Sequence, residues 1–232
     1  MKVAVFDLET NYVIQKGSTH EVIQIASVKI DLARNSIEND SFDVLVNRRN
    51  QKDINHLTKQ MTGLNNYLKM ERYKFDEAFA QFLRYSSDCD FICAWSESDF
   101  HILTDNCLHY DSTTFDWALK YVDVQKDISQ HLSNQRAISL EKALSISEIE
   151  FEGRQHNAFY DALNTGKLIL RYKNVIKFEP FINSLNLYSP LYRKCSRCEE
   201  TVYVRKFKPN GSVCELCTIK KLIKRFNYLY HN

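Results

Sequence analysis

The hydrophobic positions in the first fifty residues fall into short runs separated by polar turns. Residues 2–6 are apolar and rich in valine, which predicts a strand buried on both faces with Asp7 near its end. Residues 21–30 and 41–46 predict two further strands joined by a polar turn. Three successive strands without an intervening helix predict a meander that forms one side of a mixed sheet.

Later segments combine helical spacing with one more buried strand. Apolar residues three and four positions apart predict helices, and serine or glycine marks where some of them begin or end. The predicted helices span residues 54–61 (stopped by Gly63), 73–85, 99–108, 139–144 (capped by Ser139) and 156–172; a strand spans 91–95, and 115–124 is expected to hold both helix and strand. Strands early in the chain and helices later predict an α/β fold.

Composition indicates a globular protein of the cell interior. The chain has 232 residues, 44% of them hydrophobic, which is enough for one sizeable core and a small appended module. No stretch reaches the roughly 18 apolar residues of a membrane span, and the start of the chain lacks the pattern of a signal peptide. Four of the seven cysteines cluster near the end, unlike the spread of a disulfide-bonded secreted domain. We therefore expect a soluble, cytoplasmic protein.

The formal net charge of +2 conceals an uneven distribution. From Tyr172 onward the chain has twelve Lys/Arg and four Asp/Glu, whereas residues 1–171 have 19 Lys/Arg and 25 Asp/Glu. An acidic body with a basic tail is expected if the body holds cations and the tail meets a polyanion. A solvated surface with uneven charge is the alternative.

Two acids near the end of the first strand are placed to share a ligand. Asp7 and Glu9 are two positions apart, and such side chains point to the same face of a strand. Because their neighbours are apolar, the two carboxylates would repel each other unless a cation lay between them, and hard divalent ions prefer oxygen ligands. An Asp-x-Glu pair also arises by chance, and strand-end acids often cap loops.

Three further polar residues extend this pattern. Asp99 follows a buried strand and begins a helix, where an acid also interacts favourably with the helix dipole. Asp161 lies beside an apolar helical stripe, where a carboxylate needs a partner, and His156 precedes it by five residues. Each has a structural alternative: an N-terminal helix acid, an exposed helical acid and a structural histidine.

Together these residues resemble the DEDDh 3′-to-5′ exonucleases of the DnaQ-like superfamily over roughly residues 1–171. The resemblance is carried by DLET at residues 7–10, the acid after the middle strand, and His-x-Ala-x-x-Asp-Ala at residues 156–162, with supporting fragments at 22–26, 61–64, 93–96 and 153–158. Within the superfamily the chain looks most like the branch that trims small RNAs and the ends of histone messenger and ribosomal RNAs.

The resemblance implies a ribonuclease-H-like domain at residues 1–172, with a mixed five-stranded sheet flanked by helices. It implies that two Mg²⁺ or Mn²⁺ ions are held by four acids: Asp7, Glu9, Asp99 and Asp161. His156 would act as general base, and the products would be 5′-mononucleotides.

The resemblance also implies contacts to the terminal nucleotide. Backbone near Thr10 and Asn11 would contact this nucleotide, and Leu64 would pack against its base. A strand-end turn and a helix C-cap contact explain the same residues equally well.

Four cysteines near the C-terminal end have the spacing of a zinc site. Fifteen residues separate Cys195-x2-Cys198 from Cys214-x2-Cys217, which suits one tetrahedral ion held by four thiolates. Such a site has no open position, so its zinc is expected to be structural. Residues 193–232 are therefore predicted to form a zinc ribbon with a basic amphipathic tail, after a linker at 173–192. Two disulfides or free thiols are the alternative.

Basic and aromatic residues of this module suit single-stranded nucleic acid. Arg205, Lys206 and Phe207 offer phosphate contacts and a stacking face. The tail could instead dock on the ribosome or on a protein partner. The favoured function is a 3′-to-5′ exonuclease acting on single strands with a free 3′ end, with RNA favoured and DNA possible. A non-catalytic nucleic-acid or protein-binding adaptor and a DNA proofreading exonuclease are the alternatives.

Overall fold

The computed structural model describes most of the first 180 residues and a short hairpin further on. The described ranges are 1–12, 20–49, 52–110, 116–133, 137–180, 192–194, 196–197, 199 and 201–203. The chain divides into two compact units, Met1–Phe181 and Ile182–Asn232. In the second unit, β6 (Tyr192–Lys194) and β7 (Thr201–Tyr203) pair in antiparallel fashion. The point of division lies within the predicted linker, while the assignment of exonuclease domain, linker and ribbon stays a prediction.

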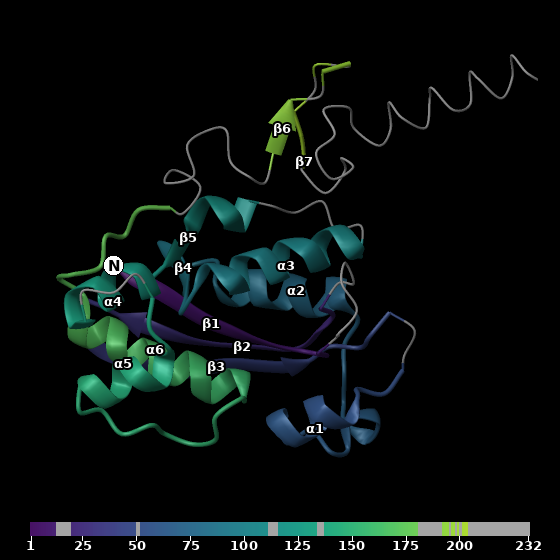
Figure 1. The fold of residues 1–232 in the computed structure, drawn as a ribbon, viewed down its shortest axis with the longest axis horizontal. Coiled ribbons are helices and arrows are strands. Elements are labelled where there is room, and N and C mark those ends of the chain that lie inside the picture. The colour runs from purple at the N-terminus through teal and green to yellow at the C-terminus, as the bar shows by residue number, and fades with distance from the viewer. Residues whose placement is uncertain are drawn as a thin grey trace, which may run out of the picture. The chain divides into compact units, whose positions relative to one another are not determined.

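A mixed sheet of five strands forms the centre of the first unit (Figure 1). Its strands are, in spatial order, β3 (Ser36–Leu45), β2 (Val22–Asp31), β1 (Lys2–Thr10), β4 (Phe91–Ala94) and β5 (Tyr121–Asp123). The β1–β2 and β2–β3 pairs are antiparallel, whereas β1–β4 and β4–β5 are parallel. This topology confirms the predicted mixed five-stranded α/β sheet, with the meander on one side.

Strand β1 occupies the middle of the sheet because its first half is apolar on both faces. Val3, Val5 and Phe6 have no exposed surface. The strand continues to Thr10, past the predicted end near Asp7, because β2 pairs with it along its whole length. The two acids therefore lie in the half of β1 that pairs with β2 and extends beyond the residues paired with β4.

Strand β3 begins at Ser36, earlier than the predicted start at residue 41. A tight turn precedes it, in which the Asp31 carboxylate accepts hydrogen bonds from the amides of Ala33 and Arg34. Asn35 adopts a left-handed conformation with φ 55°, which suits asparagine. The first half of β3 is largely polar and exposed, so hydrophobic spacing did not mark it.

Helices cover both faces of the sheet (Figure 1). They are α2 (Phe75–Tyr85), α3 (Glu97–His109), α4 (Gln125–Ser133), α5 (Leu140–Ile146) and α6 (Ala158–Tyr172). A sixth helix, α1 (His56–Thr62), lies to one side of these layers, and 3-10 turns are formed at Tyr67–Lys69 and Asp116–Lys120. Five of the six helices were predicted. Helix α4 was not, because it buries only Ile128 and Ser129 among polar neighbours and so shows no apolar stripe.

The two faces of the sheet have different cores. Beneath α4, α5 and α6 the core is mainly aliphatic and includes Val5, Val28 and Leu168. Beneath α2 and α3 it is rich in aromatic rings, such as Phe6 against Phe82 with 5.3 Å between ring centroids. The acids of β1 point to the α6 side, because Asp7 and Glu9 alternate with Phe6 along the strand.

Within the part of the chain that the structure describes, no helix combines the length and apolar character needed to cross a bilayer.

Candidate active site

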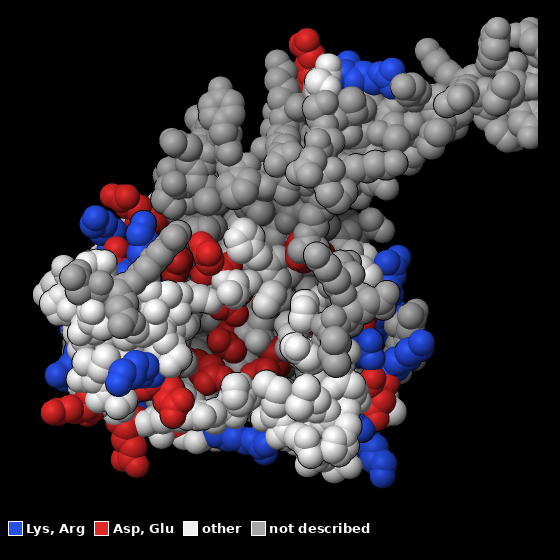
Figure 2. Space-filling view, in the orientation of Figure 1, with Lys and Arg blue, Asp and Glu red and all other residues white. Residues whose placement is uncertain are grey.

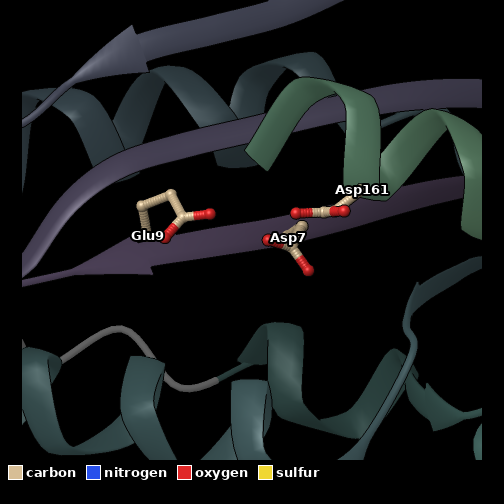
Figure 3. A group of neighbouring side chains, drawn as sticks. All are labelled: Asp7, Glu9 and Asp161. Atoms are coloured by element: carbon tan, nitrogen blue, oxygen red, sulfur yellow. The ribbon is translucent and has the colours of Figure 1, made fainter. Parts of the chain in front are cut away.

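Three carboxylates meet at the C-terminal half of β1 (Figure 3). Asp7 and Glu9 lie on β1, and Asp161 points toward them from the first turn of α6. Each offers one oxygen atom, and these three atoms all lie within 4.8 Å of one another. Figure 2 shows acidic side chains gathered in a hollow between two largely uncharged surfaces. The structure thus brings Asp161 together with two acids that lie more than 150 residues earlier in the sequence.

Small residues allow α6 to lie close to the sheet. Ala158 and Ala162 have no exposed surface, and a Cβ added at Gly166 would lie 3.5 Å from the nearest side chain of β2. The helix begins after Asn157, whose side chain accepts hydrogen bonds from two amides of the first turn. This close approach and fixed first turn place Asp161 over β1.

The fourth predicted acid, Asp99, lies in the first turn of α3 and is 8% exposed. It is not among the three acids whose oxygen atoms lie within 4.8 Å of one another. Its amide donates to the Ser96 carbonyl, and the Tyr121 hydroxyl donates to the same oxygen at 2.5 Å. The Tyr121 ring on β5 therefore fixes the turn from which Asp99 projects.

Burial raises the pKa values of all four acids, and repulsion by the other acids adds to this effect for Asp7 and Glu9. Burial raises the pKa of Asp7 well above its ordinary value, and the charges of Asp99, Asp161 and Glu9 raise it further. Burial, followed by the charges of Asp161 and Asp99, raises the pKa of Glu9 to about 8. Burial also raises the pKa of Asp99 to about 7 and that of Asp161 to about 6. The four groups resist ionising together unless a cation enters the site.

This donor set fits a divalent metal ion. Carboxylate oxygens are the ligands that Mg²⁺ and Mn²⁺ prefer. A positive charge among Asp7, Glu9 and Asp161 would relieve the repulsion that raises the pKa values of Asp7 and Glu9. The arrangement is therefore consistent with the predicted divalent metal site.

His156 lies one residue before the N-cap of α6, outside the helix that was predicted to start with it. Its side chain is exposed, and its backbone is left-handed with φ 58°. The charge of His156 lowers the pKa of Asp161, in opposition to the larger effect of burial. The histidine thus lies at the edge of the carboxylate group and is open to solvent.

A comparison with protein families covers most of the first unit. Residues 4–169 match the model of RNase_T, a family described as exonuclease. The chain belongs to this exonuclease family. The prediction of an exonuclease, and therefore of a phosphodiester hydrolase, is confirmed. The matched range includes all five residues predicted for catalysis. No curated protein matches the chain.

The structure of this chain is similar to solved structures of exonucleases. The nuclease domain of 3′hExo, a DEDDh family member bound to rAMP, has a TM-score of 0.67 and 15% identity over 75% of this chain and 92% of that one. Cell-death related nuclease 4 (CRN-4) has a TM-score of 0.66 and 20% identity, and the match covers 75% of this chain and 64% of CRN-4. The chain therefore spans less than two thirds of the length of CRN-4. Exonuclease I of E. coli in complex with a dA16 oligonucleotide has a TM-score of 0.59 and 13% identity, and the match covers 75% of this chain and 41% of that one. These likenesses confirm the ribonuclease-H-like fold.

The predicted nucleotide contacts of the exonuclease lie at the end of β1 and beyond α1. Thr10 ends β1 and is partly exposed. Asn11 is 4% exposed, and its side chain accepts a hydrogen bond of 2.9 Å from the amide of Asn55, the N-cap of α1. Leu64 is 7% exposed and packs with Tyr67 in a small apolar cluster, so little of its surface is open to a base. The roles of these residues stay predictions.

Gln24 supports the exonuclease site but was not singled out from the sequence. It lies opposite Glu9 in the β1–β2 register and is 2% exposed. Its side chain donates to Asp43 at 2.7 Å and accepts from the amide of Ala158 at 3.4 Å. It therefore joins the start of α6 to the sheet beside Glu9. A polar amide within an apolar strand is the signal that could have identified it.

The predicted residues of the zinc module lie outside the described residues. These are Cys195, Cys198, Cys214 and Cys217, together with Arg205, Lys206 and Phe207. The zinc ribbon and its nucleic-acid contacts stay predictions.

Proposed function

We propose that the chain removes 5′-mononucleotides from the 3′ end of single-stranded nucleic acid, with RNA as the favoured substrate. The observation that carries the proposal is the group formed by Asp7, Glu9 and Asp161 in a chain of the exonuclease family. The effect of Asp99 on the pKa of Asp7, second to that of burial, puts the fourth acid within electrostatic reach.

Each side chain has a role in this proposal. Asp7, Glu9, Asp99 and Asp161 would hold two Mg²⁺ or Mn²⁺ ions, which stabilise the attacking and departing oxygens of an in-line displacement when bound. His156 accepts a proton from the attacking water. Its exposure lets the imidazole pass that proton to solvent between turnovers.

The preference for RNA is supported by the motifs of the RNA-trimming branch and by one structural neighbour. A structure of a 3′-exonuclease in 3′-end specific recognition of the histone mRNA stem–loop has a TM-score of 0.66 and 14% identity over 74% of this chain and 63% of that one. Exonuclease I, by contrast, is bound to DNA oligonucleotides. A direct comparison of RNA and DNA substrates is therefore part of the test.

The test uses end-labelled single-stranded RNA and DNA with free or blocked 3′ ends, in Mg²⁺ and in EDTA. We expect stepwise loss of nucleotides from free 3′ ends, with RNA degraded faster, and no loss in EDTA or with the Asp7→Ala/Glu9→Ala protein. Asp40→Ala, which removes an exposed acid from β3, is the matched control and should remain active. Binding without turnover of any substrate would instead support the adaptor alternative.

We propose in addition that the C-terminal module holds one structural zinc through Cys195, Cys198, Cys214 and Cys217. Its basic and aromatic residues, Arg205, Lys206 and Phe207, would then bind the strand behind the 3′ end. Metal analysis of the purified chain should give one zinc per molecule, and Cys214→Ser/Cys217→Ser should lose it. If the wild-type chain contains no zinc, this part of the proposal is refuted, whereas the proposal for the exonuclease site is not affected.

A further inference from the structure

His156 adopts a backbone conformation that needs support. Its φ of 58° lies in the left-handed region, which residues with a side chain seldom adopt. Such a conformation persists only where the surrounding structure holds it. Residues 152–157, here called the His156 segment, show three separate attachments.

The first attachment fixes the start of the segment to α6. Asn164 has no exposed surface, accepts a hydrogen bond of 3.0 Å from the amide of Glu152, and donates one of 2.9 Å to its carbonyl. Gly153 lies against the ring of Tyr160, where a Cβ would come within 2.0 Å. This end of the segment therefore follows α6.

The second attachment fixes the end of the segment. Asn157 caps α6, and the amide of Ala158 donates to Gln24 on β2. These contacts hold both ends of the segment, but they do not reach its middle.

The third attachment reaches the middle of the segment from α1. The Arg154 guanidinium donates to the carbonyls of Gln60 and Met61, at 3.0 and 3.4 Å. Both carbonyls lie in the last turn of α1. The carbonyl groups at the end of a helix have no hydrogen-bond partner within the helix, and they form the negative end of the helix dipole. Gly63, the C-cap, leaves room for this contact, because a Cβ there would lie 2.2 Å from a guanidinium nitrogen.

Helix α1 is itself fastened to the end of β1. The Asn11 side chain accepts from the amide of Asn55, and the amide of Tyr12 donates to the Thr58 hydroxyl at 3.0 Å. Arg154 is exposed, so burial does not explain where it lies. Its hydrogen bonds link the His156 segment, through α1, to the strand that carries two of the acids.

We propose that Arg154 is a positioning residue for His156. By joining the His156 segment to the last turn of α1, it fixes the imidazole relative to Asp7 and Glu9. The inference rests on the proposed function, in which His156 accepts a proton from water. Proton transfer requires such placement, since a displacement of about 1 Å can lower a rate by about 100-fold.

A double-mutant cycle tests the proposal with Arg154→Ala, His156→Asn and the double variant. Asparagine suits the left-handed conformation, so His156→Asn removes the base with little change in the backbone. We expect Arg154→Ala to lower kcat about tenfold in the wild-type background and to have no effect in the His156→Asn background. Arg154→Lys should fall between, because an ammonium group cannot reproduce the forked geometry. Mn²⁺ affinity should not change in any Arg154 variant.

Arg34→Ala is the matched control, because the Arg34 side chain is 83% exposed on the turn before β3. It should keep the wild-type kcat. An equal loss from Arg154→Ala in both backgrounds, or no loss in the wild-type background, would overturn the proposal.

Hydrogen exchange provides a readout that does not depend on turnover. In Arg154→Ala the amides of residues 152–157 should exchange at least about tenfold faster, while the amides of β1 keep their wild-type rates. Unchanged exchange in the His156 segment would overturn the proposal even if activity fell. A wild-type protein that degrades no strand would refute the proposed function, and exchange would still decide whether Arg154 holds the segment.

Discussion

Replacing Glu9 by glutamine should stabilise the metal-free protein while it removes a predicted metal ligand. The pKa of Glu9 is raised from 4.5 to about 8 by burial and by the charges of Asp161 and Asp99. At neutral pH the folded protein must therefore either carry an unfavourable charge or take up a proton. Glutamine has nearly the same shape and no charge, so it avoids both costs.

The sign and the size of the effect follow from this shift. Because the pKa of Glu9 is raised in the folded state, the associated stability is fully present below pH 4.5 and is lost as the pH rises through about 8. Between pH 4.5 and pH 7 the loss is about 3 kcal/mol, at about 1.4 kcal/mol for each pH unit. For a unit of this size, that corresponds to a change in melting temperature of about 6–12 °C.

Thermal unfolding in EDTA at pH 5 and pH 8 measures this difference. The melting temperature of the wild type should fall from pH 5 to pH 8. That of Glu9→Gln should fall less, and at pH 8 it should lie above that of the wild type. Excess Mn²⁺ should raise the melting temperature of the wild type more than that of the variant. Glu150→Gln, at an exposed position, is the control and should follow the wild type. A Glu9→Gln protein that melts at or below the wild type at pH 8 in EDTA would refute the reasoning.

Three further substitutions test the frame of the site. Tyr121→Phe removes the hydroxyl that donates to the Ser96 carbonyl, so it should cost about 1 kcal/mol in thermal unfolding and weaken Mn²⁺ binding in titration; unchanged values would contradict this. Gly63→Ala should lower the free energy of unfolding by at least about 1 kcal/mol, because it combines φ 78° with a clash against Arg154; a wild-type melting temperature would argue against the clash. Phe82→Ala empties a fully buried position and should cost about 3–5 kcal/mol in denaturant unfolding, and a loss below about 1 kcal/mol would be inconsistent with that burial.

The sequence was sufficient to predict the sheet and the acids on its central strand. The spacing of Asp7 and Glu9 determines their common face in any regular strand, whatever surrounds that strand. Their approach to Asp161, across more than 150 residues, came from the family resemblance rather than from periodicity. The structure supplies the reason for this approach, which is the close packing of α6 through alanine and glycine.

Other features depend on tertiary contacts that hydrophobic spacing does not encode. Leu64 is buried with Tyr67 in a small apolar cluster that the sequence did not indicate, and its contact with a nucleotide stays a prediction. His156 was placed at the start of a helix, whereas Asn157 is the N-cap, a role for which asparagine is a common choice. Asn164 was not singled out, although a polar residue on the buried stripe of α6 calls for a partner. In each case a contact with a neighbouring segment, which hydrophobic spacing does not encode, decided the outcome.

The position of the acids on the central strand has an evolutionary consequence. Asp7 and Glu9 lie on the central strand of the sheet, so the half of the site that is predicted to bind cations is inherited together with the fold. His156, in contrast, lies on an exposed segment outside any helix or strand and contributes no core packing. One codon change there would lower turnover sharply and leave a protein that still folds and keeps all four acids. Descent from an enzyme to a protein that only protects strand ends would therefore be a short path on this scaffold.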